Sequence, residues 1–404
     1  MTEGEAWFVT QAGHTRQGNI HYFILIGVVI AAGLSQGLLL PVLAIFLERM
    51  GISSTMNGLN AAALYVGSFA MTLVAERVLG WVGFKKLIAA GLVLVMLSLL
   101  AFPLIPSVAL WFVLRLLVGI GDSALHYASQ LWILMMSTPE NRGRSISFYG
   151  MSYGIGFSIG PLGISLLKYG EAVPFIILAV LFLLLLVVVL FKLPDLKPER
   201  SQGTETAGGG RYRTSYRLAW YALIPAFLYG YMESGINSSF PVYGLRTGFT
   251  VEQIAALLPF VGIGGLLLQL PLGMWSDRFG RKRVLTFAGI TGGLCFLLIP
   301  LAGTSFWMTL VLLTIAGGFV GSFFSLGLAY AADILPRTLL PAANVVASFH
   351  FNAGSIAGPN AGGAILGTGW NGGMFVLLGG LYILFACTGI LFKVKKSTAD
   401  QESL

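Results

Sequence analysis

The chain has 404 residues, 56% of them hydrophobic and only 10% charged, and its mean hydropathy is +0.84. Soluble globular domains average about 45–50% apolar and about 25% charged residues, so this composition excludes an ordinary soluble protein. The sequence also lacks the alternating segments of about 10 residues that a membrane β-barrel requires, which leaves a bundle of membrane helices.

Apolar runs of about 20 residues, long enough to cross the bilayer core as helices, recur along the chain. The first run is too long for the apolar core of a cleavable signal peptide, so we expect it to be retained. The predicted fold class is an all-α integral membrane protein with twelve transmembrane helices in two pseudo-symmetric six-helix bundles. The predicted helices cover 21–47, 58–79, 86–105, 108–136, 145–167, 172–192, 217–243, 252–275, 284–303, 307–332, 342–366 and 372–392.

The Lys and Arg residues are distributed unequally between the two sides of this bundle. Arg49, Lys168 and Arg246 fall on one side, and Arg115 lies within a helix. The other cations fall on the side of the termini, which predicts a plasma-membrane protein with both termini in the cytoplasm. The net charge of +8 therefore needs no nucleic-acid partner, because basic loops here face anionic lipid. These cations are Arg16, Arg77, Lys85, Lys86, Arg142, Arg144, Lys192, Lys197, Arg200, Arg211, Arg213, Arg217, Arg278, Arg281, Lys282, Arg283, Arg337, Lys393, Lys395 and Lys396.

A polar stretch divides the chain. Residues 194–215 are rich in Gly, Pro and charge and are predicted to form a flexible cytoplasmic linker between one bundle at 1–193 and another, with a short tail, at 216–404. Three motifs recur across the linker at an offset of 197 or 198 residues, which predicts parallel halves suited to alternating access. The paired motifs are Arg49-Met50-Gly51 with Arg246-Thr247-Gly248, Gly83-Phe84-Lys85-Lys86 with Gly280-Arg281-Lys282-Arg283, and Gly156-Phe157-Ser158-Ile159-Gly160-Pro161 with Gly354-Ser355-Ile356-Ala357-Gly358-Pro359.

Three segments resemble motifs of one transporter family. Residues 273–282, GMWSDRFGRK, resemble the loop signature G-x-x-x-D-R-x-G-R-K of the major facilitator superfamily. Residues 115–121, RLLVGIG, resemble the fourth-helix motif of that family, and 156–163 resemble the fifth-helix G-x-x-x-G-P motif of its drug–proton antiporters. The layout matches over the whole chain, so the resemblance implies the fold of the family, a transport function and a monomeric state.

The resemblance implies that the loop after the eighth helix is a cytoplasmic latch between helices. Asp277 can accept hydrogen bonds from basic groups, and Gly280 allows a tight turn. In the first half the corresponding acid–Arg pair lies four residues further from its loop glycine, about one helical turn deeper. The alternative is that the basic residues only set the topology. The predicted latch residues are Glu76, Arg77, Gly273, Asp277, Arg278, Gly280 and Arg281.

The fifth and eleventh predicted helices carry small residues and a proline at matching positions. Small residues let helices approach closely, and a proline frees a carbonyl and bends its helix. In the family that the chain resembles, the fifth-helix bend is associated with antiport, whereas its copy in the eleventh helix is equally consistent with shared ancestry of the halves. The predicted packing residues are Gly156, Gly160, Pro161, Gly354, Gly358 and Pro359.

Ionisable residues within the predicted helices are the strongest candidates for function, because each costs about 2.5–3.5 kcal/mol to insert. Arg115, Asp122 and His126 share one face of the fourth helix, and Asp122 and His126, one turn apart, are predicted to pair. Glu233 lies in the seventh helix. The structural alternative is a satisfied Asp–His pair, a helix-packing Arg and a capped Glu.

In the family that the chain resembles, helices 1, 4, 7 and 10 line a central cavity, which implies that these ionisable groups face it. The predicted proton-coupling residues are therefore Asp122, His126, Arg115 and Glu233, with Glu233 as a second proton site or as the anchor of a cationic substrate. The predicted substrate cavity combines Gln36, Asp122, His126, Glu233 and Asn237.

These features favour a secondary active transporter that exports amphipathic or cationic small molecules in exchange for protons. A nutrient importer or facilitator, or a lipid flippase of the same fold, stays open, although a strongly anionic substrate would require more cavity cations than Arg115. A membrane enzyme is disfavoured, because the four histidines are scattered and the sequence holds no metal-ligand motif or nucleotide loop. The expected partners are a small-molecule substrate, protons and the lipid bilayer, and no cofactor or metal is expected.

Overall fold

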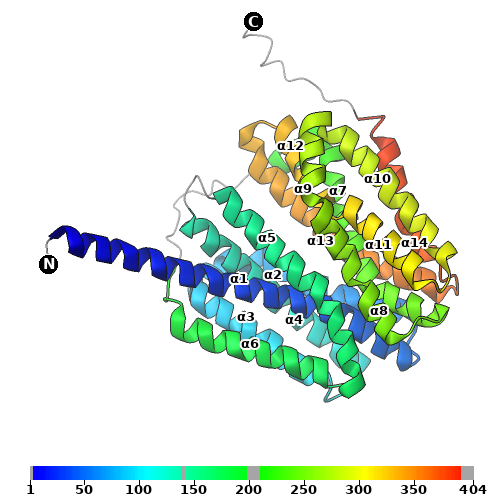
Figure 1. The fold of residues 1–404 in the computed structure, drawn as a ribbon, viewed down its shortest axis with the longest axis horizontal. Helices are drawn as coiled ribbons and strands as arrows, with labels where there is room; N and C mark the ends of the chain where they lie inside the picture. The colour runs from blue at the N-terminus through cyan, green and yellow to red at the C-terminus, as the bar shows by residue number, and fades with distance from the viewer. Residues whose placement is uncertain (1–2, 138–141, 198–209, 393–404) are drawn as a thin grey trace, which may run out of the picture. The chain divides into compact units, whose positions relative to one another are not determined.

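The computed structural model describes residues 3–137, 142–197 and 210–392, and this part of the chain consists of helices and turns without a β-strand (Figure 1). Most of the predicted linker and the cations after Phe392 lie outside the described residues. The elements are α1 (Glu3–Arg49), α2 (Ser54–Val82), α3 (Phe84–Ala101), α4 (Val108–Met136), α5 (Arg142–Ile159), η1 (Gly160–Tyr169), α6 (Val173–Lys192), α7 (Gly210–Thr247), α8 (Val251–Leu257), α9 (Pro259–Phe279), α10 (Arg281–Leu298), η2 (Ile299–Ala302), α11 (Phe306–Val320), α12 (Phe323–Ile334), η3 (Arg337–Leu339), α13 (Leu340–Gly367) and α14 (Gly373–Thr388).

The described part of the chain contains nine helical segments that are long and apolar enough to cross a membrane. Three predicted spans are not among the nine. Of these, α14 is apolar but short, whereas α7 and α13 are long and interrupted by polar residues such as Glu233 and Asn352. Helical segments therefore occupy the positions of all twelve predicted helices, and the predicted fold class, an all-α integral membrane protein, is confirmed.

Several predicted helix boundaries were wrong. The eighth predicted helix is divided into α8 and α9 at Pro259, which has no backbone N–H to continue the hydrogen-bond ladder. The tenth is divided into α11 and α12 at a Gly321–Ser322 turn. Helix α1 already begins at Glu3, and α7 begins at Gly210, inside the range predicted as linker.

The contacts divide the chain into two compact units, 1–42 with 63–200 and 43–62 with 201–404. Helices α1 and α2 each contribute to both units, because the end of α1 and the start of α2 pack with the second. This division by contacts differs from the predicted halves, 1–193 and 216–404, in where it assigns 43–62. The division into two pseudo-symmetric halves at 1–193 and 216–404 therefore stays a prediction.

Glycines mediate the closest helix contacts in both units. At each of these sites an added Cβ would overlap a carbonyl oxygen of the neighbouring helix, so only glycine permits the approach. The sites of the first unit recur in the second at offsets of 197 or 198 residues, on both sides of each contact. The pairs are Gly33 with Tyr153, Gly156 with Ile30, Gly67 with Leu116 and Gly119 with Leu64, matched by Gly230 with Phe351, Gly354 with Phe227, Gly264 with Thr314 and Gly317 with Val261.

The two predicted proline bends differ in the structure. At Gly160 and Pro161 the α-helix of α5 gives way to the 3₁₀ helix η1, as expected where a proline removes a backbone donor. Pro359 instead lies inside α13, which continues as one helix to Gly367. The first motif therefore changes the geometry of its helix, whereas its copy keeps close packing without a break.

Candidate functional site

The first unit contains two fully buried charged residues on α4. Arg115 donates from Nη2 to the Leu39 carbonyl oxygen at 3.5 Å, while its Nε and Nη1 have no hydrogen-bond partner among the described residues. Both oxygens of Asp122 likewise lack one, although the Gln36 side chain interacts with this carboxyl group. Neither residue forms an ion pair within the described part of the chain. Buried charges without partners are costly, which favours a role in function.

His126 does not pair with Asp122, so that prediction was wrong. Its Nδ1 lies 2.6 Å from the Tyr149 hydroxyl, and that hydroxyl donates to the His126 carbonyl oxygen at 3.3 Å. The Tyr149 hydroxyl thus contacts both the ring and the backbone of His126 and holds the imidazole in one orientation.

The polar cluster of the first unit continues onto α5 and α1. The Tyr153 ring packs edge-on against His126, with centroids 4.8 Å apart, and its hydroxyl donates to Gln36 Oε1 at 3.1 Å. Gln36 therefore connects the tyrosine with Asp122. Sequence reasoning placed Gln36 here but missed Tyr149 and Tyr153, whose signal was their spacing of four on α5, one helical turn apart.

Glu233 on α7 is the buried carboxylate of the second unit. Tyr229 donates to Glu233 Oε1 at 3.0 Å, while Oε2 is buried without a partner among the described residues. Asn237 and Ser234 do not cap this carboxyl group, because their side chains donate to the backbone carbonyls of Glu233 and Gly230 at 2.8 Å. Among the described residues, the Glu233 carboxylate is thus hydrogen-bonded at one oxygen, by Tyr229 and not by Asn237 or Ser234.

The second-half latch centres on Arg281. Its guanidinium contacts the carboxylates of Asp277 at 2.7 Å and Asp333 at 3.0 Å, and it donates to Ser276 Oγ at 2.7 Å. Gly280, with φ of 94°, supplies the turn that separates α9 from α10 and lets Arg281 reach back. Arg281 therefore joins the ends of α9 and α12, and Asp333 is a latch residue that sequence reasoning missed.

The remaining predicted latch residues take no part in this ion-pair cluster. Gly273 has open space around its Cα, and Arg278 lies over the neighbouring Phe279 ring at 5.4 Å. In the first unit Glu76 and Arg77 are exposed and form no ion pair among the described residues. The first-half version of the latch is therefore not formed in this structure.

The loops at Gly83 and Gly280 each contact the segment that follows the last helix of their unit, which is α6 in the first unit and α14 in the second. In the first unit the Phe84 N–H donates to the Leu196 carbonyl oxygen at 2.9 Å, and Lys86 lies 3.5 Å from the Asp195 carboxylate. In the second unit Lys282 donates to the Phe392 carbonyl oxygen at 2.7 Å. Each loop is thus fixed to the segment after the last helix of its unit, although through different residues.

Replacing Arg281 with Ala is expected to lower the thermal stability of the second unit, because Asp277 and Asp333 would then face each other without the shared cation. We expect a loss of about 1–2 kcal/mol, since the contacts are charge-assisted but partly exposed. Thermal unfolding of the purified protein measures it. Arg278→Ala, which removes a neighbouring cation without these contacts, is the control, and equal effects of the two changes would contradict the assignment.

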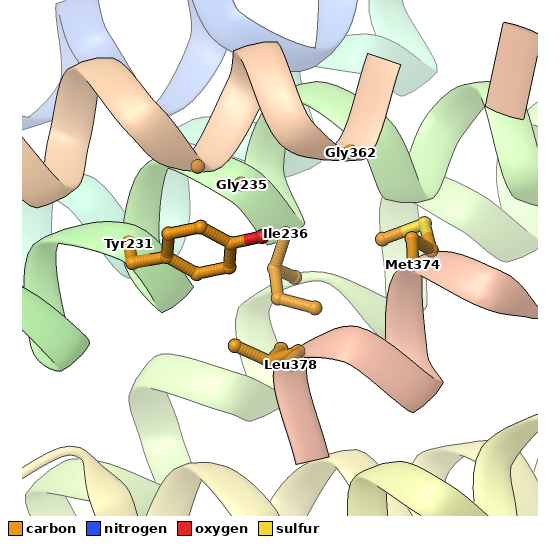
Figure 2. A pocket seen from close by; sticks show the side chains of 7 residues that line it. Tyr231, Gly235, Ile236, Gly362, Met374 and Leu378 are labelled. Carbon is orange, nitrogen blue, oxygen red and sulfur yellow. The ribbon is translucent and has the colours of Figure 1, made fainter. Parts of the chain in front are cut away.

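A small crevice lies between α7, α13 and α14, and none of these ionisable groups lines it. Figure 2 shows the Tyr231 hydroxyl pointing toward Ile236, with Leu378 and Met374 on the α14 side. Of the predicted site residues only Gly358 lines it. The remaining lining residues are Gly235 and Gly362. The crevice is mainly apolar, and its glycines belong to the close contact of α7 with α13.

The fold and the buried charges define a membrane transporter, with paired helical units and ionisable groups inside its helices. The family model of the Major Facilitator Superfamily matches residues 25–267 and 226–403. The chain is 41% identical to a Bacillus subtilis (strain 168) protein described as an uncharacterized MFS-type transporter, YfkF, over 89% of this chain and 92% of the relative. The chain therefore belongs to the Major Facilitator Superfamily.

Other relatives and solved structures agree with this assignment. Multidrug resistance protein 2 of Bacillus subtilis (strain 168) is 26% identical over 72% of this chain and 75% of its own length. The crystal structure of the nucleoside transporter NupG superposes with a TM-score of 0.75 at 15% identity, covering 92% of this chain and 100% of that one. A bacterial homolog of the human lysosomal transporter Spinster gives 0.69 at 13% identity, covering 94% and 99%. At such identities the structures show the fold alone.

Proposed function

We propose that this transporter exports amphipathic or cationic small molecules in exchange for protons, by alternating access in the plasma membrane with both termini in the cytoplasm. The observation that carries the proposal is the pair of buried carboxyl groups, Asp122 and Glu233, each with at least one oxygen unpartnered among the described residues. Burying a carboxyl group in a membrane helix costs free energy. We therefore expect each of these groups to bind and release a proton or a substrate cation during transport.

Asp122 is the proposed proton-coupling group of the first unit. Its carboxyl group contacts Gln36 and has no cation as a fixed partner among the described residues. Its proton affinity can therefore change with its hydration as the cavity opens and closes. His126, one turn further along α4 and held in orientation by Tyr149, contributes a second group that can take up a proton. Arg115 lies on the same helix about 10 Å from Asp122 along the axis, and we include it as a cation that water could connect with the carboxylate when the cavity is hydrated.

Glu233 is the proposed anchor for a cationic substrate. The ring of Tyr229, its hydrogen-bond donor, stacks on Phe351 with centroids 6.0 Å apart, and Phe351 packs edge-on against Phe324 at 6.0 Å. A carboxylate oxygen next to aromatic rings is suited to a lipophilic cation, because the rings add dispersion and cation–π attraction to the charge pair. The multidrug resistance proteins among the relatives support this substrate class.

The proposal is tested in everted membrane vesicles that hold an acid interior. Adding a lipophilic cation such as tetraphenylphosphonium is expected to dequench an acridine dye, because inward movement of the cation releases protons. Glu233→Gln should reduce the response at low substrate concentration at least about tenfold, by removal of the charge pair. Ser234→Ala, next to it on α7, is the control. A wild-type response to nucleosides or sugars, and none to cations, would favour the importer alternative.

A further inference from the structure

Arg246 lies in the last turn of α7, where its guanidinium group makes several polar contacts. Its Nε and Nη2 donate to the two carboxylate oxygens of Glu48 at 2.6 and 3.1 Å. Nη2 also donates to Ser54 Oγ at 2.6 Å, and Nη1 donates to the Leu366 carbonyl oxygen at 2.8 Å. A guanidinium bound in this forked way has a defined position as well as a charge partner.

The partners of Arg246 come from three helix ends. Glu48 lies in the last turn of α1, Ser54 is the first residue of α2, and Leu366 lies at the end of α13. The corner between α1 and α2 is short, and Gly51, with φ of 71°, makes its turn. Arg246 thus ties this corner to the ends of α7 and α13.

Beneath this cluster, α2 packs closely on α13. A Cβ at Gly58 would overlap the Pro359 carbonyl oxygen, and one at Gly363 would overlap that of Ser54. Asn60 is fully buried in the same part of α2, and neither polar atom of its side chain has a partner among the described residues. A buried amide without partners indicates a surface that is hydrated in another state of the protein.

The neighbouring cation shows that the contact is selective. Arg49 follows Glu48 directly and occupies the position in the first repeat that corresponds to Arg246 in the second. Yet Arg49 forms no ion pair within the described residues, whereas Arg246 pairs with Glu48 at 2.6 Å. Only the second-repeat arginine therefore takes part in the cluster.

We propose that Glu48 and Arg246 form a reversible tether that holds the α1–α2 corner closed on α7 and α13, and that must break for the transporter to open at this end. The tether lies on the side opposite the predicted cytoplasmic loops. The inference rests on the alternating-access part of the proposed function and not on proton coupling. A pair that forms only in the closed state stabilises that state, so under this proposal its removal shifts the population toward the open one.

The test measures how often the corner opens. Asn60→Cys is introduced into a variant carrying Cys295→Ala and Cys387→Ser, and the rate of labelling by a fluorescent maleimide is measured in lipid nanodiscs. We expect Glu48→Gln and Arg246→Gln each to raise this rate roughly tenfold. The charge-reversed double variant, Glu48→Arg with Arg246→Glu, should return it toward the starting value. Arg49→Gln is the matched control and should leave it unchanged.

Equal labelling of Glu48→Gln, Arg246→Gln and Arg49→Gln would overturn the proposal. If Arg246→Gln does not fold, Glu48→Gln still decides the matter, since it leaves the contacts of Arg246 with Ser54 and Leu366 in place. Labelling needs neither substrate nor a proton gradient. The expected labelling pattern together with no proton-coupled export would refute the proposed exchange mechanism and support the tether.

Discussion

Asp122→Asn is expected to abolish proton-driven export while leaving the protein as stable as the wild type, or more stable. Asparagine has nearly the same shape but cannot release a proton. Asp122 forms no ion pair with the described residues, and an amide can keep its contact with Gln36, so the change removes a buried ionisable group without breaking an ion pair. We expect export against a gradient to fall at least about tenfold, since the coupling step itself is lost.

Two measurements on the same preparation separate coupling from folding. Uptake into energised everted vesicles reports coupling, and thermal unfolding reports stability. Exchange of labelled for unlabelled substrate, which needs no net proton movement, should persist and serves as the internal control. A lower melting temperature with unchanged export would contradict the proposal and identify Asp122 as a structural residue.

Gly156→Ala and Gly150→Ala are expected to change stability in opposite directions, although both positions lie on α5. A Cβ at Gly156 would overlap the Ile30 carbonyl oxygen of α1, whereas a Cβ at Gly150 would meet nothing within 4 Å. The first change must push α5 away from α1 and should destabilise by about 1–3 kcal/mol. The second should stabilise by up to about 1 kcal/mol, because alanine favours the helix more than glycine does.

Thermal unfolding and the yield of folded protein measure this pair of changes. The same test applies to Gly354 in the second unit, where a Cβ would overlap the Phe227 carbonyl oxygen. Similar losses at Gly156 and Gly354 would support equivalent packing roles in the two units. If Gly156→Ala were as stable as Gly150→Ala, the close approach of α1 and α5 would not be needed for the fold.

The fold could be predicted from the sequence because apolar length and repeated motifs are local signals. The offset of 197 or 198 residues, read from three motifs, recurs in glycine contacts that the motifs did not include, such as Gly67 and Gly264. Helix breaks were harder to place. Pro259 divides its helix whereas Pro359 does not, so a proline alone does not determine where a helix breaks.

The candidate site was predicted only in part, because partners of a side chain are set by tertiary contacts. Asp122, one turn away in the sequence, was the expected partner of His126, but the imidazole contacts Tyr149 on α5 instead. Asp333 lies 52 residues from Arg281, and Glu48 lies 198 from Arg246. No spacing rule connects residues so far apart, so these contacts had to come from the structure.

The polar composition of α7 has a consequence for how the protein is made. Unlike nine other segments in the described part of the chain, α7 lacks an apolar stretch that would insert readily on its own. It packs most extensively against α13, which is synthesised much later. During synthesis, α7 must therefore reach the bilayer before its main partner exists, so its stable insertion depends on neighbours that follow it. A chain truncated before Leu340 is expected to leave α7 poorly inserted and open to degradation.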